Sequence, residues 1–334
     1  MNSEGRVAWI DISKGLLIAF IVLGHVISDN KNSLQTWLYS FHVPAFFLIN
    51  GLLKRRFLFI EKNTLITVIK KEKHLMIMYV TFSVIFLMRV IMQAFFKMYD
   101  IHDLKIFGLH LLFLNGTSVL WYIPVFVLAE IVFFLTISNA KRRMWLFVLF
   151  LAVGLFAYHH FAFKNVLNEE GIVNLIIILY IKVIIAASFM VIGYYLEYLK
   201  IFDSSIIYLL GMLSFISGIN GNIDINNLRL NNIIMFYLFG VSGALLTIAV
   251  SKIIDKYAKI IGNMLAFWGK NSIIIMLTHA IFLVYQICGI VFQNMNMTNS
   301  VSIICTFMAT MFIETIIIRM IRQSNFLSRI IFGN

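Results

Sequence analysis

Four ionisable side chains stand inside or at the edges of the first two apolar segments, at Asp11, Lys14, His25 and His42. Ionisable groups are costly in hydrocarbon, so each of them is a candidate functional residue. Lys14 and His25 are eleven residues apart, and eleven helical steps of ~100° come within ~20° of whole turns and rise about 16 Å. The spacing therefore predicts one helix with a cation near one membrane face and a titratable base near the other. Asp29 follows His25 at i+4, where its carboxylate would reach the imidazole if the helix continues.

The elements that position these residues are predicted from composition. Apolar residues make up 61% of the 334-residue chain and charged residues 13%, against roughly 45–50% and about 25% in ordinary globular proteins. Hydrophobic runs of about 20 residues recur along the whole sequence. We expect an all-α polytopic membrane protein that forms one transmembrane domain over residues 1–334, with no appended soluble domain.

About ten transmembrane helices are predicted. They fall near residues 9–28, 35–53, 74–96, 118–138, 143–160, 171–196, 205–219, 231–251, 267–291 and 299–319. The apolar stretch 104–114 is too short to cross a bilayer and is expected to be interfacial or re-entrant.

Basic residues indicate the orientation of these helices. One set of loops and flanks is rich in Lys and Arg: Arg6, Lys54, Arg55, Arg56, Lys62, Lys70, Lys71, Lys73, Lys141, Arg142, Arg143, Lys200, Lys252, Lys256, Lys259, Arg322 and Arg329. The opposite set holds only Lys31, Lys97, Lys105, Lys164 and Arg229. The positive-inside rule then places both termini in the cytoplasm of a plasma (bacterial inner) membrane protein. The net charge of +12 therefore reflects topology, and no nucleic acid partner is expected.

A family resemblance rests on three motifs of the first two apolar segments. These are WIDISKG at residues 9–15, LGH at 23–25, and SFHVPAFF at 40–47 followed by Gly51. The pattern resembles the integral-membrane acyltransferases of acyltransferase family 3, and the fucose and related sugar O-acetylases look closest. The family's hallmark of a basic residue, ten intervening residues and a histidine falls on Lys14 and His25. The resemblance implies that these two residues mark the active site.

The function that the resemblance implies is O-acyl transfer, most simply O-acetyl transfer. The donor would be cytoplasmic acetyl-CoA or another acyl-CoA, and the acceptor a hydroxyl of a surface polysaccharide or a lipid-linked sugar. His25 would be the general base, since a neutral imidazole with a reference pKa of about 6.5 can take a proton at neutral pH. Lys14 would face the phosphates of the donor or help to hold open a polar channel. Alternatively, Lys14 snorkels to the cytoplasm and His25 caps the outer end of its helix.

Two further residues of these segments have open roles. Asp11 either takes part in catalysis or neutralises Lys14 at i,i+3. His42 lies two residues before Pro44, which kinks a helix and frees a backbone carbonyl. His42 then either positions the acceptor or tunes His25, or it is a structural histidine bonded to the freed carbonyl.

Donor-binding candidates lie around the third predicted span. Lys71 and His74 resemble the family's arginine-rich entry to that helix, with lysine and histidine in place of arginine, and they are alternatively ordinary positive-inside charges. Arg89 lies within the apolar part of the span, where an arginine usually faces a partner. Glu130 of the fourth span, which is also a candidate acceptor or pocket residue, is a candidate partner, in a functional or a purely structural pair.

Acceptor or pocket residues are expected later in the chain. Trp121 and Tyr122 open a WYIP segment that resembles the family's WYLP or WFLP, and their rings would stack on a sugar or line an acyl pocket, unless they belong to an interfacial aromatic belt. His279 matches a late histidine of these proteins and is otherwise a core histidine. Glu314 has no assigned role.

Other chemistries find little support in the sequence. The His159–His160 pair has no third ligand nearby, so no metal site is expected, and no bound cofactor is indicated. Cys288 and Cys305 suggest neither a disulfide nor a nucleophile. The alternative function is a transporter or export component for a polysaccharide or a lipid-linked glycan precursor, with the histidines in a proton relay. Repeated halves, common in transporters, are not visible.

Overall fold

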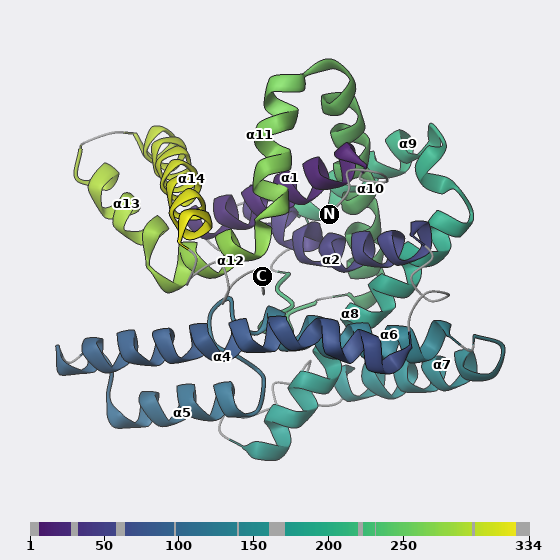
Figure 1. Ribbon diagram of the computed structural model, residues 1–334, viewed down its shortest axis with the longest axis horizontal. Coiled ribbons are helices and arrows are strands. Elements are labelled where there is room, and N and C mark those ends of the chain that lie inside the picture. The colour runs from purple at the N-terminus through teal and green to yellow at the C-terminus, as the bar shows by residue number, and fades with distance from the viewer. Residues whose placement is uncertain are drawn as a thin grey trace. The chain divides into compact units, whose positions relative to one another are not determined.

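The computed structural model describes residues 7–27, 33–57, 64–96, 98–138, 140–159, 171–219, 223–230, 232–295 and 298–324. Within these ranges the regular secondary structure is helical, joined by turns and loops, with one isolated β-bridge between Asp224 and Arg229. The chain forms two compact units (Figure 1), which are described separately below. Asp29, the proposed i+4 neighbour of His25, lies outside the described residues.

The first unit comprises residues 1–49, 196–223 and 230–324. Its helices are α1 (Ala8–Val26), most of α2 (Ser33–Arg56), α9 (Ile206–Met212), α10 (Ile233–Tyr257), α11 (Lys259–Lys270), α12 (Ser272–Ile281), α13 (Val284–Gln293) and α14 (Asn299–Gln323). Helix α1 is the core of this unit, because α10, α11, α12, α13 and α14 all pack against it. Its Leu17, Ile18 and Val22 are fully buried. The helix is thus enclosed on most of its surface, which explains why it is apolar nearly all round.

Helices α1 and α11 touch through their backbones. A Cβ atom added to Gly15 would lie 2.0 Å from the carbonyl oxygen of Leu265, and one added to Gly269 would lie 1.8 Å from that of Asp11. Small residues permit this close approach in membrane helices. The two glycines therefore fix the start of α1, with Asp11 and Lys14, against α11.

The helical stretch after α10 is broken twice. Helices α11 and α12 meet at Asn271 with a bend of 71°, and the side-chain nitrogen of Asn271 donates to the carbonyl of Phe267 at 2.6 Å. Leu283, between α12 and α13, is left-handed with φ 57°. The predicted span 267–291 is therefore not one helix, because an asparagine that bonds the backbone and a left-handed leucine both interrupt it.

The second unit comprises residues 50–195 and 224–229 of the described chain. It contains α4 (Leu65–Phe95), α5 (Ile101–Leu112), α6 (Tyr122–Ile137), α7 (Ala140–Ala157) and most of α8 (Ile172–Tyr198). In Figure 1, α5 runs beside the long helix α4, which also packs against α6. Asp100 begins α5 with a capping box that includes Asp103. The predicted short apolar stretch 104–114 is thus mostly the twelve-residue helix α5.

The described helices confirm an all-α protein suited to a membrane. Six of them are long and apolar enough to cross a bilayer: α1, α2, α4, α8, α10 and α14. The bent pair α11–α12 would make a seventh. Shorter apolar helices lie at Tyr122–Ile137, Phe147–Ala157, Ile206–Ser217 and Val284–Gln293, within or close to predicted spans. The length and composition of the described helices therefore indicate six or seven candidate membrane spans.

Candidate active site

Two histidines from distant parts of the chain meet in the first unit. His25 lies in the last turn of α1 and His279 in the last turn of α12, and their ring centroids are 5.2 Å apart. Tyr285, at the start of α13, lies 5.7 Å from the His25 ring and 6.0 Å from the His279 ring. Tyr39 of α2 adds a fourth ring, 6.4 Å from His25. These four residues are called the histidine cluster below.

His42 borders this cluster from α2. Its ring stands edge-on to Tyr39 with 4.9 Å between centroids, and its Nδ1 bonds the carbonyl oxygen of Leu38 at 2.5 Å. Pro44 frees a different carbonyl, that of Ser40 four residues earlier. The structural alternative in which His42 bonds the carbonyl freed by proline is therefore wrong, because the ring reaches back one turn along its own helix instead.

The buried histidines have a defined tautomer when they are neutral. His279 Nδ1 lies 2.6 Å from the carbonyl oxygen of Ile275, and His42 makes the matching contact with Leu38. A carbonyl only accepts hydrogen bonds, so Nδ1 carries the hydrogen and Nε2 is left as an acceptor. The Nε2 atom of His279 is buried and finds no hydrogen-bond partner among the described residues.

His25 differs from the other two histidines in its exposure. His279 is 0% exposed and His42 is 5% exposed, whereas His25, Tyr39 and Tyr285 are only partly buried. A general base must reach the proton that it abstracts. Within the cluster, His25 is therefore the more exposed histidine, and His279 is the fully buried one.

The other polar residues of α1 lie toward its opposite end. Lys14 and His25 belong to the same continuous helix, as the spacing predicts. Asp11 is buried and pairs with Lys270 of α11, with 3.9 Å between Nζ and Oδ2. Lys14 is half-buried. Asp11 thus has a cationic neighbour from another helix.

Six predicted site residues belong to the second unit. Lys71, His74 and Arg89 are all on α4, Trp121 and Tyr122 open α6, and Glu130 lies within α6. Lys71 is exposed and His74 half-buried. The Arg89 guanidinium lies over the ring of Phe86 at 4.8 Å. The structure therefore places Asp11, Lys14, His25, His42 and His279 in one unit, where the three histidines lie close together, and these six residues in the other.

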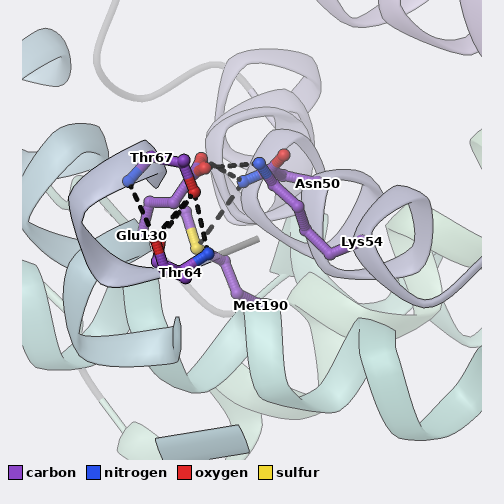
Figure 2. A network of polar contacts seen from close by, with 6 residues as sticks. All are labelled: Asn50, Lys54, Thr64, Thr67, Glu130 and Met190. Atoms are coloured by element: carbon purple, nitrogen blue, oxygen red, sulfur yellow. Dashed lines mark hydrogen bonds and ion pairs between the residues drawn. The ribbon is translucent and has the colours of Figure 1, made fainter. Parts of the chain in front are cut away.

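Glu130 takes part in a polar network of the second unit (Figure 2). Its carboxylate pairs with Lys54 and accepts a hydrogen bond of 3.2 Å from Asn50 Nδ2, which also lies 3.8 Å from Met190 Sδ. Glu130 is 1% exposed, and the Lys54 side chain is 15% exposed. The partner of Glu130 is therefore Lys54 rather than Arg89, because the last turn of α2 supplies the nearer cation.

Lys182 is a buried cation that our sequence analysis did not consider. It lies in the apolar helix α8, is 3% exposed, and holds its ammonium 5.1 Å from the centre of the Trp121 ring. It also donates to Asn226 Oδ1 at 3.1 Å. The sequence feature that could have identified Lys182 is a lone lysine within a long apolar run. Trp121 is thus engaged by a cation on one face, which ties α6 to α8.

Metal binding finds no support among the described residues, where no group of three or more His, Cys, Asp or Glu side chains is placed to hold an ion. His160, the second member of the His159–His160 pair, lies outside the described residues.

Comparison with known proteins gives one match. A family model described as an acyltransferase domain, Acyl_transf_3, matches residues 7–327. No curated protein and no solved structure matches the chain. The match covers both units and favours acyl transfer over the alternative of transport.

Proposed function

This chain belongs to acyltransferase family 3, and from that premise we propose that it is a membrane O-acetyltransferase. It takes the acyl group from cytoplasmic acetyl-CoA and transfers it to a hydroxyl of a surface carbohydrate or a lipid-linked sugar. It works in the plasma membrane with ten spans and both termini in the cytoplasm. Within the family, this corresponds to the sugar O-acetylase branch.

One observation carries the proposal: the partly exposed His25 packs against the fully buried His279 at a ring distance of 5.2 Å. A general base needs both access to substrate and a fixed orientation. The histidine cluster supports both needs, since Tyr39 and Tyr285 flank the His25 ring and the buried histidine behind it cannot move without disturbing the core.

The proposed reaction needs no covalent acyl-enzyme. A nitrogen of the His25 imidazole takes the proton of the acceptor hydroxyl, and the resulting oxygen nucleophile attacks the thioester carbonyl. The carbon–sulfur bond breaks, the acetyl group remains on the acceptor oxygen, and coenzyme A leaves as a thiolate. The imidazolium then returns its proton to the thiolate directly or through water, which restores neutral His25.

Donor and acceptor would engage other residues. Coenzyme A carries phosphates, and the exposed side chains of Lys70, Lys71 and Lys73 on α4 are available to them. Lys14, half-buried on α1, supplies a cation on the same helix as His25. Tyr122 is partly exposed and is the aromatic candidate for the acceptor, with the buried Trp121 beside it, and Arg89 and His74 remain donor candidates.

The test is acetyl-CoA turnover by the purified protein in nanodiscs, with acetyl-CoA binding followed in parallel. We expect His25→Ala to lower turnover by about 10²- to 10⁴-fold, the usual contribution of a general base, while binding persists. Lys14→Ala should weaken binding. His102→Ala, which changes an exposed histidine of α5, is the matched control. A wild-type protein that neither binds nor consumes any acyl-CoA would refute the proposal.

A further inference from the structure

We propose that Glu314 is a positioning residue of the histidine cluster: by holding Thr278, it fixes the short helix that carries His279 against His25. The inference rests on the proposed function, because it assigns His25 to the acyl-transfer step. It concerns a residue of α14 whose role the sequence left open.

Helix α12 is not held in place by the chain on either side of it. It has ten residues, which corresponds to about 15 Å of helix. A bend of 71° separates it from α11, and the left-handed Leu283 separates it from α13. A short helix with a break at each end depends on side-chain contacts for its orientation.

Helix α14 supplies polar contacts to both sides of the break at Asn271. Thr315 accepts a hydrogen bond of 3.0 Å from Trp268 of α11, and Arg322 donates to Asn271 Oδ1 at 2.8 and 3.2 Å. The third contact, 2.5 Å between Glu314 Oε2 and Thr278 Oγ1, lies one residue before His279. Only this contact of the three acts at the end of α12 that reaches the histidine cluster.

Glu314 stands where packing alone would favour a hydrocarbon side chain. It shares the buried face of α14 with Met311, Ile318 and Ile321 and is 0% exposed. Its Oε1 atom is buried, and no described residue forms a hydrogen bond with it. Burying such an oxygen costs free energy, so a glutamate here is not explained by stability.

The Glu314–Thr278 contact can be removed by the substitution Glu314→Leu without unfolding α12. Thr278 Oγ1 lies 2.8 Å from the carbonyl of Ile274 as well as 2.5 Å from Glu314, and a hydroxyl has a single hydrogen. Loss of the carboxyl group therefore leaves Thr278 satisfied by Ile274. Glu314→Leu should retain the fold and the stability but lose the link between α14 and the end of α12.

The experiment compares Glu314→Leu, Glu314→Gln and Thr278→Val with wild type in nanodiscs. We expect Glu314→Leu and Thr278→Val each to lower kcat by about 10- to 100-fold, as misplacement of a reacting group does, with the KM for acetyl-CoA and the thermal midpoint unchanged or improved. Glu314→Gln, which keeps a hydrogen-bonding partner for Thr278, should restore most of kcat. The double variant should be no slower than either single variant, because both break one contact.

A second readout does not require turnover. The rate at which diethyl pyrocarbonate modifies His25, followed by mass spectrometry of its peptide, should rise severalfold in Glu314→Leu and Thr278→Val and stay near wild type in Glu314→Gln. The inference would be overturned if Glu314→Leu and Thr278→Val both kept the wild-type kcat and the wild-type rate of His25 modification. So would a loss of activity that merely follows a loss of thermal stability. A wild type without any acyl-CoA turnover would refute the proposed function alone, since the modification rates still decide the role of Glu314.

Discussion

The imidazole rings of His25 and His279 lie 5.2 Å apart and are tilted by 48° to one another. His25 lies in the last turn of α1, near the start of the chain. His279 lies in the last turn of α12, in the C-terminal part of the chain. No local sequence signal joins them, and their contact exists only when α12 packs on α1. The candidate base, His25, therefore packs against a residue that lies far from it in the sequence, His279.

Tyr285 should prove to be part of the site although its sequence neighbourhood gives no hint of it. Its ring covers both His25 and His279. We expect Tyr285→Ala to lower kcat by about 10-fold or more, because the His25 ring loses a neighbour that fixes its orientation. Tyr285→Phe keeps the ring and should lie close to wild type. Steady-state kinetics of both variants check this, and equal loss in both would instead assign the effect to the hydroxyl.

The glycine contact between α1 and α11 predicts that Gly15→Ala and Gly108→Ala change the stability of the protein in opposite directions. Gly15→Ala places a methyl group 2.0 Å from the Leu265 carbonyl oxygen, and such overpacking typically costs about 1–3 kcal/mol or more. Gly108→Ala of α5 meets nothing within 4 Å and should stabilise its helix by about 0.5–1 kcal/mol. Thermal unfolding in detergent measures both. Equal midpoints would show that the α1–α11 packing is looser than described.

The Lys54–Glu130 pair should be strongly coupled. Removing one partner leaves a buried charge, which typically costs about 3–5 kcal/mol, so Lys54→Met and Glu130→Gln should each lower the thermal midpoint. The double variant, with both charges gone, should recover most of the loss. A double-mutant cycle measures this coupling, and strictly additive effects would contradict it.

Lys71 tests the donor assignment through the phosphates of the substrate. We expect Lys71→Gln to raise the KM for acetyl-CoA by about 2- to 5-fold, as befits an exposed ion pair worth under about 1 kcal/mol. The KM for acetyl-pantetheine without those phosphates should not change. Lys259→Gln, which alters another exposed lysine, is the control. An equal change with both donors would remove Lys71 from the phosphate site.

The predicted orientation in the membrane can be tested with reporter fusions. Green fluorescent protein fused after residue 334 should fluoresce, because both termini are expected in the cytoplasm. Alkaline phosphatase inserted after Gly171 should be active, since the flank of α8 at that residue is expected outside. An inactive phosphatase together with a dark fluorescent fusion would reverse the orientation.

The first helix was predictable because its signals are local. The spacing of eleven positions from Lys14 to His25, within one apolar run, suffices to place both on one helix, and α1 contains both. The break at Asn271 does have a local signal, since Gly269, Lys270 and Ser272 surround it, but the apolar residues on both sides still make 267–291 read as one span by average hydropathy. Periodicity and hydropathy indicate which face of a segment is buried, but they do not identify the segment that packs against it.

The partners of buried charges were equally out of reach. Arg89 and Glu130 lie in neighbouring predicted spans, which suggested a pair, yet Lys54 from the end of α2 occupies that position. Likewise nothing in the sequence connects Glu314 to Thr278. Such contacts depend on the depth and rotation of each helix, and those are set by packing against neighbours.

The break at Asn271 has a consequence for biogenesis. Its side chain closes the break by bonding Phe267, but it is itself held by Arg322 of α14. A ribosome delivers α14 after α11, α12 and α13, so the hydrogen bonds of Asn271 can be complete only once α14 has been synthesised and has docked.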